Sequence, residues 1–296
     1  MRDAFASEII RLIQEDNKIL LLTGDLGFGV FDEIQKKYPK NFINIGVAEQ
    51  NMSGIAAGLA IEGYKVFTYS IANFSTFRCL EQIRNDIAYH DLNVTIVSVG
   101  GGFSYGSLGM SHHATEDISI MRSMPGMKVC VPATKSEAIS ATRHLAFSNG
   151  PGYLRIDKSD FSNEEYEEPQ YNFGQSSLIK EGADIAIICS GGILEEAVLA
   201  SEELAIEGIS CRVLSMHTIK PIDKEAIIRA VSETRGIVSL EEHTVVGGLG
   251  SAISEVCMEH SLYPEFFLSI GLKDTFSQVV GDQQYLRNYY QMDSDF

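Results

Sequence analysis

A glutamate that follows a short apolar run is the first residue whose position suggests chemistry. Glu49 lies in the segment INIGVAEQN (43–51), and small residues dominate the segment behind it, MSGIAAGLA (52–60). In open α/β sheets, ligands bind where a strand ends and a helix begins, and a carboxylate there can exchange a proton with a bound base. The plainer alternative is that Glu49 only stabilises the first turn of its helix, where negative charge is favoured.

Aromatic residues follow in the next part of the chain. Phe74 and Phe77 are three residues apart and Ile71 precedes them by three, so a helix would place all three on one face. A flat heterocycle can pack there, and offset stacking adds about 0.5–1.5 kcal/mol beyond the buried area. On spacing alone, core packing is the better explanation.

Two arginines occupy positions that suit an anionic ligand. Arg78 directly follows the aromatic pair, and Arg155 lies in the apolar run YLRI (153–156). Loops gather ligands at the carboxyl end of a strand, and the planar fork of a guanidinium can bind paired ligand oxygens there. Solvation at the surface is the alternative for both.

Two histidines come after a glycine-rich run. His112 and His113 follow GGGFSYGSLG (100–109). A histidine that changes charge near neutral pH can donate a proton to a reacting carbonyl or alkoxide. The glycine run has neither a P-loop lysine nor the GxGxxG spacing, so it is better interpreted as a mobile loop at the mouth of a site.

The elements that must position these residues can be inferred from apolar runs that alternate with amphipathic stretches, a pattern typical of parallel α/β sheets. In the first half we expect a helix over the first 15 residues and strands at 18–23, 42–45, 65–69, 94–99, 127–131 and 152–156. Helices are expected between them at 31–38, 48–61, 74–90, 116–123 and 135–148. In the second half we expect strands at 184–190, 210–215, 236–240 and 266–270, and helices at 193–207, 223–232 and 249–260.

A change of composition divides the two halves. Residues 157–175 are acidic, polar and poor in aliphatic side chains, which is typical of a surface linker. The sequence therefore predicts two domains, 1–160 and 179–296, joined by a linker at 161–178. Each is expected to be a three-layer α/β/α domain with a mostly parallel sheet. The second domain carries no group of residues that suggests catalysis.

The composition of the whole chain restricts its partners. The formal net charge of −17 argues against nucleic acid and anionic membrane surfaces, which demand basic patches. The longest apolar runs are far too short to cross a bilayer, and no signal peptide is recognisable. The five cysteines are scattered and never form CxxC, so neither a zinc site nor a disulfide framework is indicated. We therefore expect a cytoplasmic protein.

The motifs also resemble a known family when they are taken in order. The segment INIGVAEQNMSGIAAGLAIEGYKVF (43–67) is similar to the glutamate segment of the pyrimidine-binding domain of transketolases and 1-deoxyxylulose-5-phosphate synthases. Similar family segments are FSTFRCLEQIRND (74–86), GMSHHATED (109–117), MRSMPGM (121–127), VPAT (131–134) and SLEEHTVVGGLGS (239–251). The resemblance thus covers nearly the whole chain.

The resemblance implies roles around the cofactor thiamine diphosphate. Glu49 is expected to hydrogen-bond the ring nitrogen N1′ of the aminopyrimidine and so activate the cofactor. Phe74 is expected to stack on the pyrimidine, with Ile71 and Phe77 completing its pocket. Asp25 stands where relatives carry an aspartate near the cofactor. Such a carboxylate needs a mostly apolar site, because water would compete for its hydrogen bond.

The resemblance also implies residues that bind the substrate. His112 aligns with the family histidine that binds the oxygen-bearing end of the donor, and His113 is expected to share this role. Arg78 and Arg155 are expected to contact the phosphate or distal oxygens of a sugar or sugar-phosphate substrate, with Arg2 as a further candidate.

One departure affects the choice of donor. Ser107 and Leu108 stand where many sugar-using relatives carry an acidic pair that includes a donor-reading aspartate. Without that carboxylate, a deoxygenated sugar or a small 2-oxoacid such as pyruvate becomes more plausible.

A missing motif predicts a second subunit. The family holds Mg²⁺ and the diphosphate with a GDG motif and a later asparagine, and oxygen ligands suit this ion. Gly24, Asp25 and Leu26 give only a partial match. We therefore expect no metal site in this chain. A separate N-terminal subunit should hold the diphosphate and Mg²⁺, in a two-plus-two heterotetramer that is active only when both subunits are present.

Two other functions remain open. The nearest is the beta subunit of a 2-oxoacid dehydrogenase, or a pyruvate-using enzyme like 1-deoxyxylulose-5-phosphate synthase. The second is a non-catalytic assembly or regulatory subunit with the same fold. A nucleotide-binding oxidoreductase is disfavoured, because the chain has no dinucleotide fingerprint. The favoured interpretation is a transferase that moves a two-carbon ketol or acyl unit between sugar-type substrates.

Overall fold

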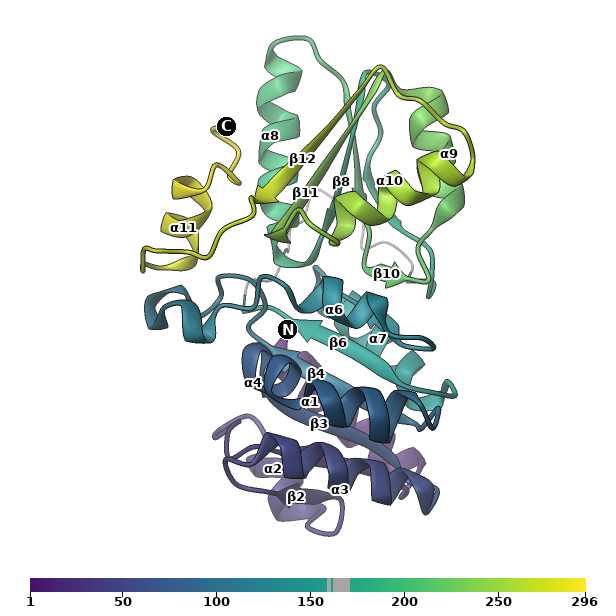
Figure 1. The fold of residues 1–296 in the computed structure, drawn as a ribbon, viewed down its shortest axis with the longest axis vertical. Coiled ribbons are helices and arrows are strands. Elements are labelled where there is room, and N and C mark those ends of the chain that lie inside the picture. Colours follow the sequence, from purple (N-terminus) through teal and green to yellow (C-terminus); the bar gives the residue numbers. More distant parts are fainter. Residues whose placement is uncertain (159–160, 162–170) are drawn as a thin grey trace.

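The structure is a computed structural model that describes residues 1–158, 161 and 171–296. Its two α/β units lie one above the other in Figure 1, with the N-terminal unit below. The part of the predicted linker that spans 162–170 lies outside the described residues. Within the described residues, no helix is both long and apolar enough to cross a membrane.

The larger sheet belongs mainly to the N-terminal unit. Its order is β10-β5-β6-β4-β3-β1-β2, and all neighbouring strands are parallel except β10 and β5. Six strands come from the first half of the chain: β1 (Ile19–Thr23), β2 (Phe42–Asn44), β3 (Lys65–Ile71), β4 (Val94–Val99), β5 (Lys128–Cys130) and β6 (Gly152–Ile156). Because these six strands are parallel, the loops that follow them open at one edge of the sheet.

Helices cover both faces of this sheet. They are α1 (Arg2–Glu15), α2 (Asp32–Lys37), α3 (Glu49–Ile61), α6 (Asp117–Ser123) and α7 (Lys135–Phe147). Helices α1 and α7 pack on one face, while α3 and α6 lie on the other (Figure 1). Successive side chains of β1 point to opposite faces of the sheet: Leu20 packs in the core on the α3 side and Leu21 in the core on the α1 side.

The segment between β3 and β4 is a helix that repeatedly changes pitch. It consists of α4 (Ala72–Thr76), the 3₁₀ turn η1 (Phe77–Cys79), α5 (Leu80–Gln82) and the π-helical η2 (Ile83–Ala88). The helical stretch expected at 74–90 is therefore present over residues 72–88, but its pitch is not uniform. The hydroxyl of Thr76 donates to the carbonyl of Ala72 at 2.5 Å, and Ser75 donates to that of Ile71 at 3.2 Å. Such bonds compete with the helical pattern and bend the chain.

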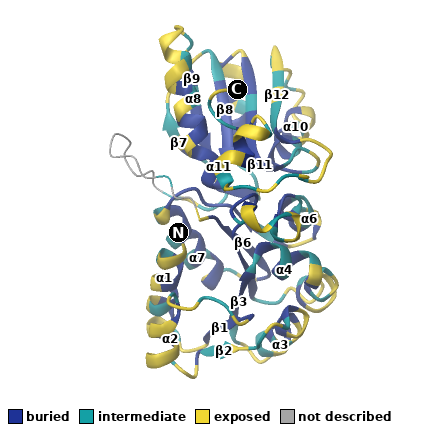
Figure 2. Ribbon diagram, turned by 90° about the vertical axis from the view of Figure 1, so that its left-hand side faces the viewer, coloured by how far each residue is buried: buried dark blue, intermediate teal, exposed yellow. Residues whose placement is uncertain are grey.

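The smaller sheet belongs to the C-terminal unit, in the order β12-β11-β8-β9-β7. Its strands are β7 (Ser177–Lys180), β8 (Ile185–Ser190), β9 (Cys211–Ser215), β11 (Gly236–Thr244) and β12 (Phe266–Leu272). Its helical elements are the turn η5 (Gly191–Ile193), α8 (Leu194–Ile206), α9 (Lys224–Glu233), α10 (Leu249–Glu259) and α11 (Gln283–Tyr289). Figure 2 shows the central strands buried between more exposed helices. The predicted class of two α/β domains with mostly parallel sheets is confirmed.

A short strand of the C-terminal unit completes the sheet of the other unit. Strand β10 (Thr218–Lys220) pairs antiparallel with β5, and Val131 N donates to the carbonyl of His217 at 2.8 Å. The core continues across the same junction, where Met216 and Ile219 join the cluster that contains Val129. Three residues are too few to show a strand period, so the sequence did not predict this exchange.

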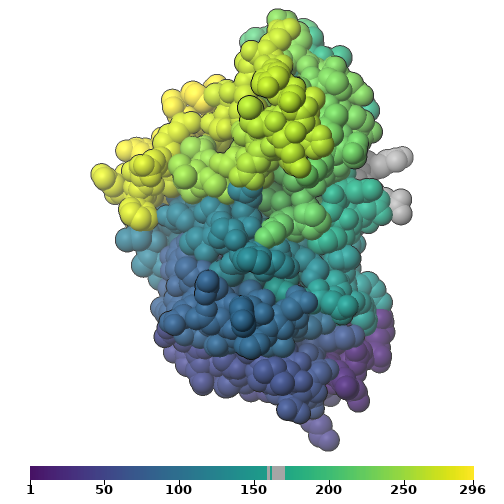
Figure 3. Space-filling model, turned by 45° about the vertical axis from the view of Figure 1, so that its right-hand side comes forward, coloured from purple at the N-terminus to yellow at the C-terminus, as the bar shows by residue number. Residues whose placement is uncertain are grey.

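The C-terminal helix α11 reaches back over the glycine-rich loop, a second feature that the sequence did not predict. That loop forms two 3₁₀ turns, η3 (Gly106–Leu108) and η4 (Met110–His112). A Cβ added at Gly106 would lie 2.5 Å from the side chain of Leu286 and 2.6 Å from the carbonyl oxygen of Gly281, so only glycine allows this approach. Figure 3 shows the yellow C-terminal segment beside this teal part of the N-terminal unit.

Candidate active site

Glu49 is the buried centre of a polar group at the carboxyl edge of the larger sheet. It is the first residue of α3 and is 1% exposed. Its Oε1 accepts a hydrogen bond from Ser70 Oγ at 3.1 Å, and its Oε2 accepts one from Arg78 Nη1 at 2.6 Å. A Cβ at Gly24 would approach Oε1 to 3.3 Å, so the small residue leaves room beside the carboxylate. The carboxylate is thus far more enclosed than helix-end charge alone requires.

The aromatic ring of Phe74 forms the second wall of this group. The guanidinium carbon of Arg78 lies 4.5 Å from the ring centroid. The ring of His112 meets Phe74 edge to face, with 5.1 Å between centroids and 67° between planes. Glu49, Phe74, Arg78 and His112 are therefore brought together from three separate segments of the chain, and we call these four residues the glutamate cluster.

The other expected cofactor residues are chain neighbours of residues that lie beside Glu49, namely Ser70, Arg78 and Gly24. Ile71 ends β3 and packs, half-buried, against the core on the α1 side. Phe77 is half-buried in η1. Asp25 has a left-handed backbone with φ of 58° and is held by Asn44, whose Nδ2 donates to Asp25 Oδ1 at 2.9 Å. This pair ties the loop after β1 to the end of β2.

The two adjacent histidines have different environments. His112 is half-buried, with its Nδ1 3.0 Å from Ser111 Oγ. His113 is 3% exposed, and its Nε2 lies 3.2 Å from the carbonyl of Gly106. Its ring meets Phe103 edge to face at 5.2 Å. His113 therefore packs within the loop, and His112 is the histidine of the cluster. A role of His113 in binding the substrate stays a prediction.

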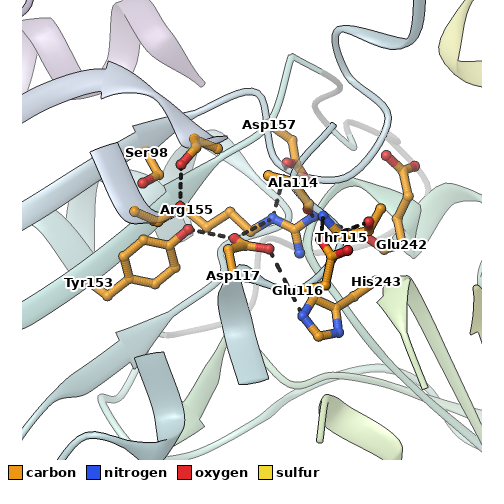
Figure 4. Close-up of polar contacts among 12 residues, drawn as sticks. Ser98, Ala114, Thr115, Glu116, Asp117, Tyr153, Arg155, Asp157, Glu242 and His243 are labelled. Atoms are coloured by element: carbon orange, nitrogen blue, oxygen red, sulfur yellow. Dashed lines mark hydrogen bonds and ion pairs between the residues drawn. The ribbon is translucent and has the colours of Figure 1, made fainter. Parts of the chain in front are cut away.

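Arg155 lies at the junction of the two units and not at an open edge (Figure 4). Its side chain is 3% exposed. Its Nε lies 3.4 Å from Asp117 Oδ2 and 3.9 Å from Asp157 Oδ1, and its Nη2 donates to the carbonyl of Glu242 at 2.9 Å. In this structure its guanidinium compensates two buried carboxylates, and its contact with a substrate phosphate stays a prediction.

The buried carboxylates beside Arg155 change the pKa values of the tyrosine and the arginine that they contact. Burial, reinforced by Asp117, raises the pKa of Tyr153, whose hydroxyl donates to Asp117 Oδ2 at 2.5 Å. Burial would lower the pKa of Arg155, but the charges of Asp117 and Asp157 outweigh it and raise the pKa above its usual value. The ion pairs thus keep the arginine charged.

The pKa of Asp157 predicts a measurable pH effect. Burial raises it to about 6, although Arg155 lies close and Gly192 N donates to the carboxyl at 2.7 Å. In an unfolded chain the group titrates near pH 3.9, so between about pH 4 and 6 the folded protein binds more protons. The stability due to this group is present at the low end of the window and is lost as pH rises through it.

The variant Asp157→Asn removes this titration. We expect its free energy of unfolding, minus that of the wild type, to increase from pH 4 to pH 6 in urea titrations. A difference that stays constant over this range would contradict the raised pKa.

Arg2 is exposed at the start of α1, and its charge acts on Tyr105 in the loop that carries His112, where it opposes the rise in the tyrosine pKa that burial causes. The pKa of Lys158 is lowered, chiefly by the partial burial of Lys158 and secondly by the positive charge of Arg2. Lys158 Nζ lies 3.8 Å over the ring of Tyr105 in the same loop. Two cations therefore flank this loop from the N-terminus and from the end of β6.

A residue that the sequence reasoning missed, Glu242, anchors the loop from the C-terminal unit. Its Oε1 accepts from Phe103 N at 2.6 Å and from Gln283 Nε2 at 2.8 Å, and its Oε2 accepts from Arg287 Nε at 2.5 Å. One buried carboxylate thus joins β11, α11 and the loop of His112. The sequence does contain an indication of this role: Glu242 follows Glu241 in an expected strand, and adjacent acidic residues rarely lie in a buried strand without partners.

Comparison with family models covers both units. Residues 1–163 match the model described as transketolase, pyrimidine binding domain, and residues 174–295 match transketolase, C-terminal domain. The chain belongs to the transketolase family. This confirms the resemblance drawn from the motifs and accounts for the order of the two units.

Some similar proteins in this family are named as subunits. The 6-deoxy-6-sulfo-D-fructose transketolase subunit SqwH of Clostridium sp. (strain MSTE9) is 35% identical over 98% of this chain and 89% of its own length. One subunit of the apulose-4-phosphate transketolase of Phocaeicola vulgatus is 35% identical over 99% of this chain and 94% of its own. A solved structure described as a split gene transketolase, inactive beta4 tetramer, superposes with a TM-score of 0.90 at 35% identity, covering 99% of this chain and 94% of that one. The chain thus corresponds to the C-terminal subunit of split transketolases.

Proposed function

We propose that this chain acts as the C-terminal subunit of a two-component, thiamine diphosphate-dependent transketolase-like enzyme, with Glu49 as the cofactor-activating carboxylate. The observation that carries the proposal is the glutamate cluster: a carboxylate that is 1% exposed, beside an aromatic face and a histidine. Subunits that lose catalysis have no reason to keep this combination.

The residues of the cluster fit the aminopyrimidine of thiamine diphosphate. Glu49 offers an acceptor in a buried site, and Gly24 leaves space beside it. One face of Phe74 is covered by the planar guanidinium of Arg78, so a flat group that donates hydrogen bonds fits between Glu49 and this ring. Burial around the carboxylate excludes the water that would compete for its hydrogen bond.

Each residue then has a separable role. Glu49 holds a proton shared with the pyrimidine nitrogen, and Ser70 fixes the orientation of its carboxylate. When bound, thiamine diphosphate supplies the electron sink that makes cleavage of a carbon–carbon bond next to a carbonyl feasible. His112 lies beside Phe74, where its ring can donate to an oxygen of the donor substrate.

The diphosphate and Mg²⁺ are proposed to be held by an N-terminal partner subunit. Among the described residues, no group of three or more His, Cys, Asp or Glu side chains could hold a metal ion. The relatives named as subunits support a separate partner chain. A two-plus-two heterotetramer is the proposed assembly.

The proposed substrate is a sugar with an anionic group. The names of two relatives specify a sulfo sugar and a sugar phosphate. Arg2 and Lys158, which flank the loop of His112, are the cations we propose for this group, since Arg155 is buried among carboxylates. Leu108 stands where many sugar-using relatives have an acidic residue that binds a donor hydroxyl, which favours a donor with fewer hydroxyl groups.

Calorimetry with thiamine diphosphate and Mg²⁺ tests the proposal. We expect tight binding to a mixture of this chain and its partner subunit, and none to this chain alone, because the diphosphate ligands lie on the partner. Tight binding by the chain alone would overturn the split site. No binding in the mixture would favour a non-catalytic assembly subunit.

A further inference from the structure

The guanidinium of Arg78 lies in the space where the proposed function places the pyrimidine. It donates to Glu49 Oε2 at 2.6 Å and lies with its central carbon 4.5 Å from the centroid of Phe74. A group that both hydrogen-bonds Glu49 and stacks on Phe74 must share this space. Arg78 therefore uses the same two contacts that a bound aminopyrimidine needs.

A guanidinium suits this space for reasons of shape and charge. It is flat, it presents N–H donors in its plane, and it stacks on aromatic faces. These are the features by which a carboxylate and a phenyl ring recognise an aminopyrimidine. The buried carboxylate of Glu49 also needs a compensating charge when no ligand is bound, because an unpaired buried charge is strongly unfavourable.

We propose that Arg78 is a gate: it occupies the pyrimidine site in the cofactor-free subunit, and cofactor binding displaces it from Glu49 and Phe74. This inference rests on the proposed function, whose cofactor it concerns. It differs from the role expected from the sequence, in which Arg78 contacts only the substrate. The displacement makes cofactor binding weaker than an empty site would allow.

The environment of Arg78 permits this displacement. Its side chain is 43% exposed, whereas that of Glu49 is 1% exposed, so the arginine can move into solvent without opening the core. Glu49 is its only hydrogen-bond partner among the described residues. It lies in η1, where the helix changes from α to 3₁₀ geometry, and such irregular turns frequently mark hinges.

Calorimetry on the assembled two-subunit enzyme tests the gate before any substrate is added. Arg78→Met removes the charge and the planar donors but keeps an extended apolar side chain. We expect thiamine diphosphate, with Mg²⁺, to bind the variant enzyme about tenfold more tightly, because one charge-assisted hydrogen bond no longer has to be broken. Arg78→Lys keeps the charge without the flat fork and should give an intermediate affinity.

A nearby arginine provides the matched control. Arg84 is exposed on η2 and donates only to its neighbour Asn85 among the described residues. Arg84→Met removes the same charge from the same segment and should leave cofactor affinity unchanged. An Arg78→Met enzyme that binds the cofactor equally or more weakly than the wild type would overturn the gate.

A second measurement separates failure of the gate from failure of the proposed function. Thermal unfolding of this chain alone, for Arg78→Met, Glu49→Gln and the double variant, measures the coupling between the two residues without cofactor. We expect the two effects to be non-additive. Additive effects would show that the contact is absent in solution and would overturn the gate, whereas a wild-type mixture that binds no cofactor would overturn the proposed function.

Discussion

Replacement of Glu49 by glutamine should lower kcat of the mixed two-subunit enzyme by about 10²- to 10⁴-fold, the usual range for loss of a positioned acid or base. Glutamine keeps the length of the side chain and can still accept from Ser70, which bonds Oε1 at 3.1 Å. It cannot carry the negative charge or share a proton with a ring nitrogen. Alanine at the same position should abolish turnover while the fold remains intact.

The control for this prediction lies at the other end of the same helix. Glu62 caps the end of α3 and is exposed, so Glu62→Gln should leave kcat unchanged. Circular dichroism and the formation of the mixed complex should be normal for all three variants. Near-normal turnover by Glu49→Gln would remove Glu49 from the chemistry and return it to the plainer role of a helix-end charge.

Alternation of apolar and amphipathic segments was sufficient to predict both domains. Strands such as β4 and β8 are mostly apolar and almost wholly buried, because both faces of a parallel sheet are covered by helices. Short or exposed elements were missed because they bury too few side chains to give a recognisable pattern. Strand β10 has three residues, and α11 has only two buried side chains in seven residues, so neither shows a periodic pattern.

The site was predictable where single segments carry the information and not where distant segments meet. The order of motifs led to Glu49, Phe74 and His112, which do come together. Nothing in the segment around Arg78 indicates that its guanidinium pairs with a carboxylate 29 positions earlier. The burial of Arg155 likewise depends on the packing of a second domain that no local pattern describes.

Substitution of Arg155 is therefore expected to affect the stability of the fold, whereas its position in the sequence suggests an effect on substrate binding. Its side chain is 3% exposed, and the two carboxylates that it compensates, Asp117 and Asp157, are 0% and 7% exposed. Arg155→Met should lower the free energy of unfolding at pH 7.5 by roughly 3–5 kcal/mol, because removing one partner leaves buried charge uncompensated. Urea unfolding of this chain measures the effect.

The dependence on pH and a surface control make this prediction specific. The destabilisation should decrease toward pH 5, since Asp157, whose pKa burial raises to about 6, can then be neutralised by protonation. Arg235→Met should change stability by less than about 0.5 kcal/mol, because Arg235 pairs with Glu265 while both side chains are mostly exposed. If Arg155→Met instead kept full stability and raised the KM for a phosphorylated substrate, Arg155 would belong to the substrate site after all. The junction of the two domains would then have to open before Arg155 could contact a substrate, because in this structure its guanidinium pairs with Asp117 and Asp157.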